Sequence, residues 1–323
     1  MMQERDSTIL VVGATGTVGG AAARSLLASG ARVRALVRSD PDPNDFSGVE
    51  LVRGDLADAA AVQKALTGVR AAVYVSPHER DEELIGERFV RACERAGVRL
   101  VFVGVHIDAP TRVGRALRRF LFGRLLAHYV PKFRIAERAR VSSASPVVLM
   151  PTNFFQNDEI FRRELLAGSF VQPFERPINR VDVRDIGDAA ARACLDASLP
   201  PGAYPVVGPE SLDGKSCAES WTAELGRRVA YDPDDARFAG AVARELRGKK
   251  RDDFLASYAV IRKLAMPTSE RDLARTRALL GRAPTSYAKY VHDTVTAWRS
   301  ADRAPRDASA KSSSMSMPDF NRA

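Results

Sequence analysis

The fold of this chain is decided by residues 8–19, which read TILVVGATGTVG. The first five of them form an uninterrupted, largely β-branched run that predicts a strand buried on both faces. Glycines then recur at every third position, as Gly13, Gly16 and Gly19, and an Ala- and Leu-rich segment follows. The stretch therefore predicts a strand, a tight turn and the start of a helix.

Each glycine has a physical role in such a turn. Gly13 permits the sharp reversal, Gly16 lets the backbone approach a pyrophosphate, and Gly19 lets the helix pack against the strand. The N-terminus of the helix also suits phosphate groups, through its unpaired N–H groups and its dipole. A glycine triplet alone is often only a structural turn, but this context favours dinucleotide binding. The residues expected to hold the dinucleotide here are Gly13, Thr15, Gly16, Thr17, Val18 and Gly19.

Strands and helices alternate along the first half of the chain. Apolar runs predict further strands at 32–38, 49–52, 71–75, 100–105 and 146–150, and helical periodicity predicts helices at 17–28, 59–66, 82–96 and 131–142. This alternation implies an α/β fold with a doubly wound parallel sheet of the Rossmann type. Ligands of such a sheet bind at the carboxyl ends of its strands. We therefore expect an NAD(P)-binding domain at residues 1–155.

The pattern loosens beyond residue 150. Helices are expected at 158–167, at 186–195 and over most of 216–298, and short strands at 181–185 and 204–207. These pieces predict a smaller, mainly helical substrate-binding lobe at 156–300, partly interleaved with the Rossmann sheet. Residues 301–323 are rich in Ser, Ala and charge, which predicts a disordered tail.

Composition narrows the class of protein. The net charge of +9 suggests affinity for anions in general, without separating a phosphate-bearing cofactor from nucleic acid or lipid. Cys93, Cys194 and Cys217 are odd in number and widely separated, which argues against a disulfide framework or a metal site. We find no secretory leader, no apolar run of the roughly 18 residues that span a bilayer, and no DNA-binding motif. We therefore expect a cytoplasmic protein that takes a small-molecule substrate and binds neither metal, membrane nor nucleic acid.

The end of the second strand bears on the choice of cofactor. The position about 20 residues beyond the glycine turn faces the adenosine ribose, where an acid binds the 2′-hydroxyl and an arginine accommodates a 2′-phosphate. Here that position is Arg38, so we favour NADP(H) over NAD(H). Asp40 is the rival that would favour NAD(H), and Arg38 could also be only a solvated residue at a strand end.

Two carboxylates follow the third strand. Asp55 stands at its carboxyl end, where it could accept a hydrogen bond from the adenine amino group or cap the next turn. Asp58 precedes the helix at 59–66, and capping alone explains it. Asp55 is therefore the better candidate for a cofactor ligand.

Residues 112–128 form a basic, amphipathic segment. Arginines at 112, 115, 118, 119 and 124 surround Val113, Leu117, Phe120, Leu121 and Leu125. The simplest interpretation is a helix with one solvated and one packed face. A homodimer contact, a protein partner, a lid over the substrate or, less readily, a membrane or nucleic-acid surface are the alternatives.

Taken together, these motifs resemble the NmrA-like family of atypical short-chain dehydrogenases/reductases. The resemblance covers residues 8–298 and rests on VGATGTVG at 12–19, ALVR at 35–38, GDL at 54–56, Lys132 with Glu137, NFFQN at 153–157, DVRDIG at 182–187, LGR at 225–227 and GRAPTS at 281–286. It implies that the glycine turn, Arg38, Asp55 and Leu56 hold NADP(H). It also implies that Ser76 and Asn153 border the cofactor and that Lys132 lies beside the nicotinamide ribose.

The sequence departs from the wider superfamily at the expected catalytic pair. Standard members carry Tyr-x-x-x-Lys, which places both side chains on one helical face. Here Tyr129 is three residues before Lys132, Pro131 stands between them, and His128 takes the position four before the lysine. We therefore name Lys132, with His128, as the catalytic candidates.

The family resemblance implies two functions. Some members are NADPH-dependent reductases of quinones, enones or aromatic natural products. Others bind NADP(H) without turnover and act as redox-sensing regulators through a protein partner. The glycine turn, Arg38 and Lys132 favour the reductase, whereas the missing Tyr-x-x-x-Lys and the basic segment at 112–128 favour the regulator.

Overall fold

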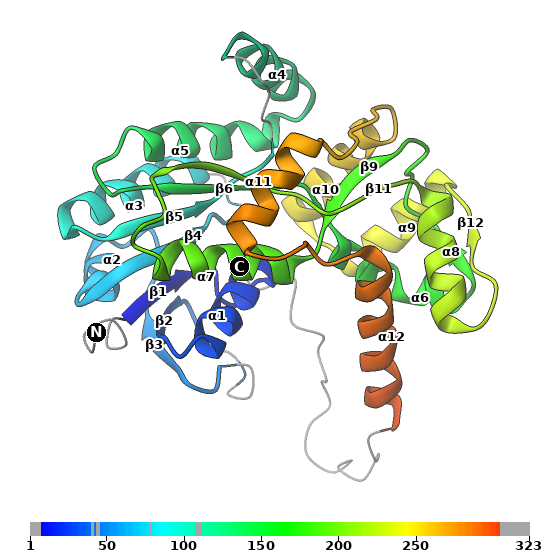
Figure 1. The fold of residues 1–323 in the computed structure, drawn as a ribbon, viewed down its shortest axis with the longest axis horizontal. Coiled ribbons are helices and arrows are strands. Elements are labelled where there is room, and N and C mark those ends of the chain that lie inside the picture. Colours follow the sequence, from blue (N-terminus) through cyan, green and yellow to red (C-terminus); the bar gives the residue numbers. More distant parts are fainter. Residues whose placement is uncertain are drawn as a thin grey trace.

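The core of the protein is a seven-stranded, wholly parallel sheet in the order β10-β6-β5-β4-β1-β2-β3 (Figure 1). The computed structural model describes residues 8–39, 42, 46–77, 79, 81–106 and 112–303. The strands are β1 (Thr8–Val12), β2 (Arg32–Val37), β3 (Val49–Arg53), β4 (Val69–Val75), β5 (Arg99–Val103), β6 (Val147–Pro151) and β10 (Gly202–Val206). This order confirms the predicted α/β, doubly wound sheet. The chain adds β2 and β3 on one side of β1 and then β4, β5 and β6 on the other, so the point where the strand order reverses lies between β1 and β4.

Helices cover both faces of the sheet. One face carries α1 (Thr17–Ala28), α7 (Val183–Leu195) and part of α11 (Glu270–Leu280). The other face carries α2 (Ala59–Leu66), α3 (Glu82–Ala96) and α5 (Val130–Arg140). The side chains of β1 are completely or almost completely buried between these layers, which explains its continuous apolar run.

A second, aromatic core forms the C-terminal lobe. It is built around Trp221, Phe155, Phe174, Tyr258 and Tyr287, all buried. Its elements are β7 (Asn153–Phe154), the 3₁₀ helix η2 (Phe155–Phe161), α6 (Arg162–Leu166), β8 (Ser169–Phe170), β9 (Ile178–Val181), β11 (Ser211–Leu212), α8 (Gly214–Leu225), β12 (Ala230–Tyr231), α9 (Asp235–Glu245), α10 (Gly248–Ile261) and α12 (Tyr287–Arg303).

The two halves of the chain are interleaved. β10 pairs with β6 at the edge of the main sheet, although it lies about fifty residues beyond the first domain that we assigned. α7 packs along α1 so closely that a Cβ on Gly187 would lie 2.6 Å from the carbonyl oxygen of Ala21. The lobe therefore contributes both a strand and a covering helix to the Rossmann layer.

Three sequence expectations beyond residue 150 need correction. The strand expected at 181–185 ends at Val181, because the side chain of Asp182 accepts from the backbone N–H of Arg184 and starts α7 three residues earlier than expected. The helix expected at 158–167 is a 3₁₀ helix, η2, followed by the short α6. Residues 301–303, expected in the tail, are the end of α12, and the remainder of that tail lies outside the described residues.

The basic segment forms α4 (Arg112–Leu125), which stands apart from the body of the molecule in Figure 1. The described side chains of its apolar face are not packed, since Val113 is 78% exposed and Phe120 is 61% exposed. The simplest interpretation, one face packed on the core, is therefore wrong. The side chains of Arg112, Arg115, Leu117, Arg118 and Arg119 lie outside the described residues, as does Asp40.

Cys93, Cys194 and Cys217 are free and buried. Burial raises the pKa of each thiol to about 12. In the part of the chain that the structure describes, no helix is both long enough and apolar enough to cross a bilayer.

Candidate active site

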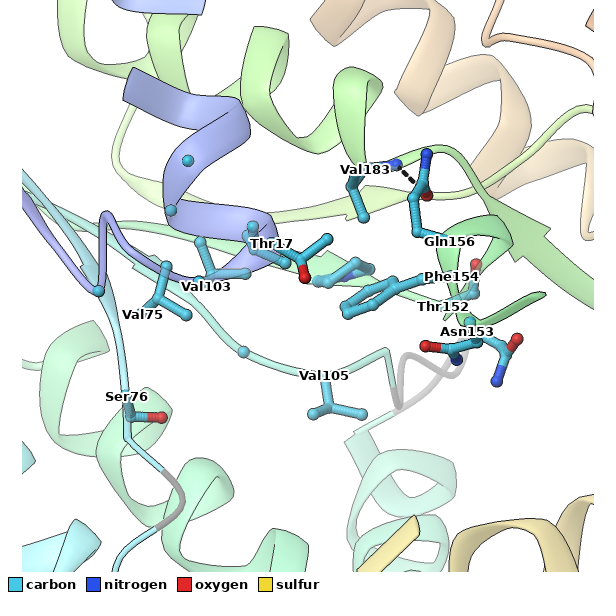
Figure 2. A pocket seen from close by; sticks show the side chains of 18 of the residues that line it. Thr17, Val75, Ser76, Val103, Val105, Thr152, Asn153, Phe154, Gln156 and Val183 are labelled. Carbon is cyan, nitrogen blue, oxygen red and sulfur yellow. Dashed lines mark hydrogen bonds between the residues drawn. The ribbon is translucent and has the colours of Figure 1, made fainter. Parts of the chain in front are cut away.

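A cavity of about 2000 Å³ lies at the carboxyl ends of β1, β4, β5 and β6 and extends into the C-terminal lobe. Every residue that the sequence predicted for the site lines it, from the glycine turn to His128, Lys132 and Asn153. Figure 2 shows one part, where Phe154 extends toward Thr17 and Asn153 lies near Thr152. The backbone N–H of Val183 donates to Gln156 Oε1 at 3.0 Å and fixes the η2 side of this wall.

The glycine turn has the geometry that its sequence predicts. Gly13 has φ +82°, a left-handed conformation that glycine adopts readily, and it produces the sharp reversal after β1. A Cβ on Gly19 would clash with the Gly13 carbonyl, which fixes α1 against the turn. Gly16, the N-cap of α1, is different, since a Cβ there would meet only the Gly13 carbonyl oxygen, at 3.4 Å. Internal packing therefore does not require a glycine at position 16, and the exposed backbone there is open to a ligand.

The end of the cavity beside β2 and β3 holds the predicted polar residues. Arg38, just after β2, lines the cavity and forms an ion pair with Glu79, with 2.9 Å between Nη1 and Oε1. Asp55 Oδ1 accepts from the backbone N–H of Ala57 at 2.7 Å, so one of its oxygens stabilises the local turn. Asp58 caps α2 by accepting from Ala60 N–H, as expected. Asp55 and Leu56 both line the cavity.

Lys132 belongs to a buried cluster with Ser76 and Glu82. Its Nζ lies 2.8 Å from Ser76 Oγ and 2.5 Å from Glu82 Oε1. Ser76 Oγ in turn donates to Glu82 Oε1 at 2.6 Å. Glu82 is fully buried and its second oxygen, Oε2, has no hydrogen-bond partner. Lys132 is therefore held by a carboxylate that the sequence analysis did not identify as part of the site.

Burial lowers the pKa of Lys132, while the carboxylate of Glu82 acts in the opposite direction. An ammonium has three N–H donors, of which this cluster uses two. Lys132 therefore retains one N–H for a group in the cavity.

His128 and Tyr129 lie on the separate 3₁₀ turn η1 (Ala127–Tyr129) that precedes α5. His128 Nε2 lies 2.9 Å from Ser257 Oγ of α10, and Tyr129 Oη lies 3.3 Å from the same atom. Burial lowers the pKa of His128 and raises that of Tyr129. Pro131 is in the first turn of α5, so His128 and Lys132 do not share one continuous helix.

Asn153 is oriented by residues of the lobe. Its Oδ1 accepts from Arg180 Nε at 3.0 Å, and its Nδ2 donates to Tyr258 Oη at 3.4 Å. Arg180 is fully buried and pairs with Asp158, with 2.6 Å between Nη2 and Oδ1. This pair raises the pKa of the Arg180 guanidinium, against the effect of burial. The network fixes the amide of Asn153 at the cavity wall.

Other titratable groups that the sequence analysis did not name also line the cavity, among them His106 and Glu159. His106, which follows β5, lies 3.1 Å from Asp272 Oδ2 of α11 and lowers the pKa of that carboxyl. Burial raises the pKa of Glu159 in η2 to about 7. Neither residue belongs to a motif, so only the folded structure brings them to the site. Among the described residues, no group of three or more His, Cys, Asp or Glu side chains could hold a metal ion.

The family of the chain follows from comparison with known proteins. The model of the NmrA-like family matches residues 5–235, and the chain belongs to this family. It is 29% identical over 231 residues to an NAD(P)H azoreductase of Xenophilus azovorans, over 69% of this chain and 76% of that protein.

Solved structures that share the fold include a regulator and a reductase. NmrA, a negative transcriptional regulator solved with NADP, matches with a TM-score of 0.74 and 19% identity, over 93% of this chain and 98% of its own. The triphenylmethane reductase of Citrobacter sp., solved with NADP(H), matches with a TM-score of 0.70 and 18% identity, over 90% and 100% of the two chains.

Proposed function

We propose that this protein is an NADPH-dependent reductase that transfers hydride to a quinone, an enone or an aromatic substrate resembling a natural product. The observation that carries the proposal is one continuous cavity that joins the glycine turn to the aromatic lobe. The lobe side of this cavity is lined by Phe154, Phe254, Tyr258 and Tyr290, which suit a flat, conjugated ligand. NADP-linked reductases among its relatives and structural neighbours are in line with it.

The residues present fit the cofactor. Gly16 offers an open backbone face at the N-terminus of α1, where a side chain would occupy the space of a pyrophosphate. Arg38 and Lys132 both line the cavity; Arg38 would supply a cation for the adenosine ribose, and Lys132 would offer one N–H to the nicotinamide ribose or the substrate. A reduced nicotinamide supplies the hydride when it is bound.

The residues of the chain bind and orient the substrate and stabilise the negative charge that develops on it. Lys132, fixed by Ser76 and Glu82, donates a hydrogen bond to the oxygen on which negative charge develops. Asn153, fixed by Arg180, supplies a second oriented polar group at the same wall. His128, whose neutral form is favoured by burial, holds the wall of α10 through Ser257 and leaves Nδ1 for the substrate.

Stopped-flow oxidation of NADPH across a panel of quinones and enones tests this proposal. Turnover with at least one of them, lost in the Lys132→Met variant, supports the reductase. Tight NADPH binding without turnover on the whole panel contradicts it.

We also propose that the protein works in the reducing cytoplasm, because its three cysteines are free and buried.

The exposed apolar face of α4 supports a second candidate function. A non-catalytic regulator that responds to NADP(H) would need a surface for a partner protein, and Phe120, Leu121 and Leu125 offer one. A pull-down with the full chain should then differ between NADP⁺ and NADPH. An unchanged result, or a result unaffected by Phe120→Ser, contradicts this alternative.

A further inference from the structure

Arg38 and Glu79 come from different sides of the glycine turn. Arg38 follows β2, Glu79 follows β4, and β1 lies between these two strands in the sheet. Neighbouring strands are about 4.8 Å apart, so β2 and β4 lie about 10 Å apart on either side of β1. The side chains of Arg38 and Glu79 meet in a 2.9 Å ion pair, and both residues line the cavity. The ion pair therefore lies at the end of the sheet where the adenosine part of a dinucleotide is expected to bind.

The two charges have opposite preferences for the ribose. A carboxylate accepts a hydrogen bond from the 2′-hydroxyl of NAD(H), and it repels the 2′-phosphate of NADP(H). A guanidinium attracts that phosphate, and its planar fork binds either a carboxylate or a phosphate. In this chain the guanidinium of Arg38 already binds a carboxylate.

We propose that Glu79 sets the nucleotide preference of the site by occupying Arg38 in place of the 2′-phosphate. This inference rests on the proposed function only in requiring that the cavity bind a pyridine nucleotide. NADP(H) must displace Glu79 from Arg38, whereas NAD(H) leaves the ion pair in place and gains an acceptor for its 2′-hydroxyl. The protein is therefore expected to use both nucleotides, with a smaller preference for NADP(H) than Arg38 alone would give.

The exposure of the pair determines how large the effect is. The side chains of Arg38 and Glu79 are 52% and 37% exposed, so water screens their attraction and the pair is readily exchanged. Exposed pairs of this kind change affinities by about two- to fivefold. Because the two nucleotides respond in opposite directions, the ratio of their affinities is expected to change by about tenfold.

The chain offers a matched control. Glu83 forms a similar exposed ion pair with Arg134, 2.8 Å between Oε2 and Nη1, but neither residue lines the cavity. Glu83→Gln removes the same charge four residues from Glu79 without changing the crevice. Any general effect of net charge on nucleotide binding appears equally in both variants.

The test is titration calorimetry of NADPH and NADH against the wild type, Glu79→Gln and Glu83→Gln. Glu79→Gln is expected to tighten NADPH and weaken NADH, each about two- to fivefold, while Glu83→Gln leaves their ratio as in the wild type. An unchanged NADPH-to-NADH ratio in Glu79→Gln overturns the inference and leaves the reductase proposal standing. Failure of the wild type to bind either nucleotide overturns both.

Discussion

Replacing Glu82 by glutamine should destabilise the protein by about 3 kcal/mol, because it removes the charged partner of a buried ammonium. Lys132 is only 7% exposed and Glu82 is fully buried, so water cannot replace the lost carboxylate. Losing one partner of a buried ion pair costs about 3–5 kcal/mol, and we take the lower value because the glutamine carbonyl can still accept a hydrogen bond. The midpoint of thermal unfolding should fall by about 6 °C, at roughly 2 °C per kcal/mol for a chain of this size.

The loss of stability in Glu82→Gln should also depend on pH. The folded protein lowers the pKa of Lys132 from its ordinary 10.5, so between the two values the unfolded chain binds more protons. Stability therefore rises with pH in that window and falls as the pH drops through the folded pKa. Removing Glu82 lowers the folded pKa further and extends the window downward. The deficit of Glu82→Gln should accordingly grow as the pH is lowered below the folded pKa of Lys132 in the wild type.

Denaturant unfolding of the wild type, Glu82→Gln and the double variant Glu82→Leu/Lys132→Met measures both effects. Removing both charges leaves no buried ion unpaired, so the double variant should recover to within about 1 kcal/mol of the wild type. If Glu82→Gln loses less than about 1 kcal/mol, or the double variant is as unstable as the single one, the cluster does not hold a charged lysine in the way described.

Four other predictions follow from the structure. Gly16→Val should leave the fold intact but abolish nucleotide binding in calorimetry; retained affinity would make the turn purely structural. Arg38→Asp should weaken NADPH far more than NADH in the same assay, and equal losses would show that Arg38 does not face the 2′-phosphate. Gly187→Ala should lower stability by about 1–3 kcal/mol in thermal unfolding by forcing α7 away from α1, whereas Gly240→Ala in a roomy part of α9 should raise it by about 0.5–1 kcal/mol. The raised pKa of Glu159, about 7 against an ordinary 4.5, means that its contribution to stability is largest below about pH 4.5 and is lost, by about 3 kcal/mol, as the pH rises to about 7; Glu159→Gln should remove that slope in denaturant titrations.

The strands and helices of the Rossmann half could be predicted to within about two residues, because their signals are local. The run at residues 8–12 has to be buried on both faces, and Gly13 and Gly19 are needed for the turn that follows. The position of β10 could not be predicted in the same way, since a short strand carries no information on which edge it will join.

The polar residues of the site show the same limit. Glu82 is in the first turn of α3, where an acid is expected only for its interaction with the helix dipole. Nothing in the sequence indicates that it faces inward to Lys132. The segment VDVRD at 181–185 contains two acids, and we expected the strand to extend to the second of them, whereas Asp182 caps α7 and the strand ends before it.

The packing of α7 on α1 has a consequence for synthesis of the protein. A nascent chain that has just completed β6 already contains the whole glycine turn, yet the outer face of α1 is still bare. That face is covered only after α7 has left the ribosome. The sheet is complete only when its edge strand β10, which ends at Val206, has been added. At about 5–20 residues per second, synthesis from the end of β6 to the end of β10 takes several seconds. During this interval the incomplete domain exposes apolar surface to which a chaperone can bind.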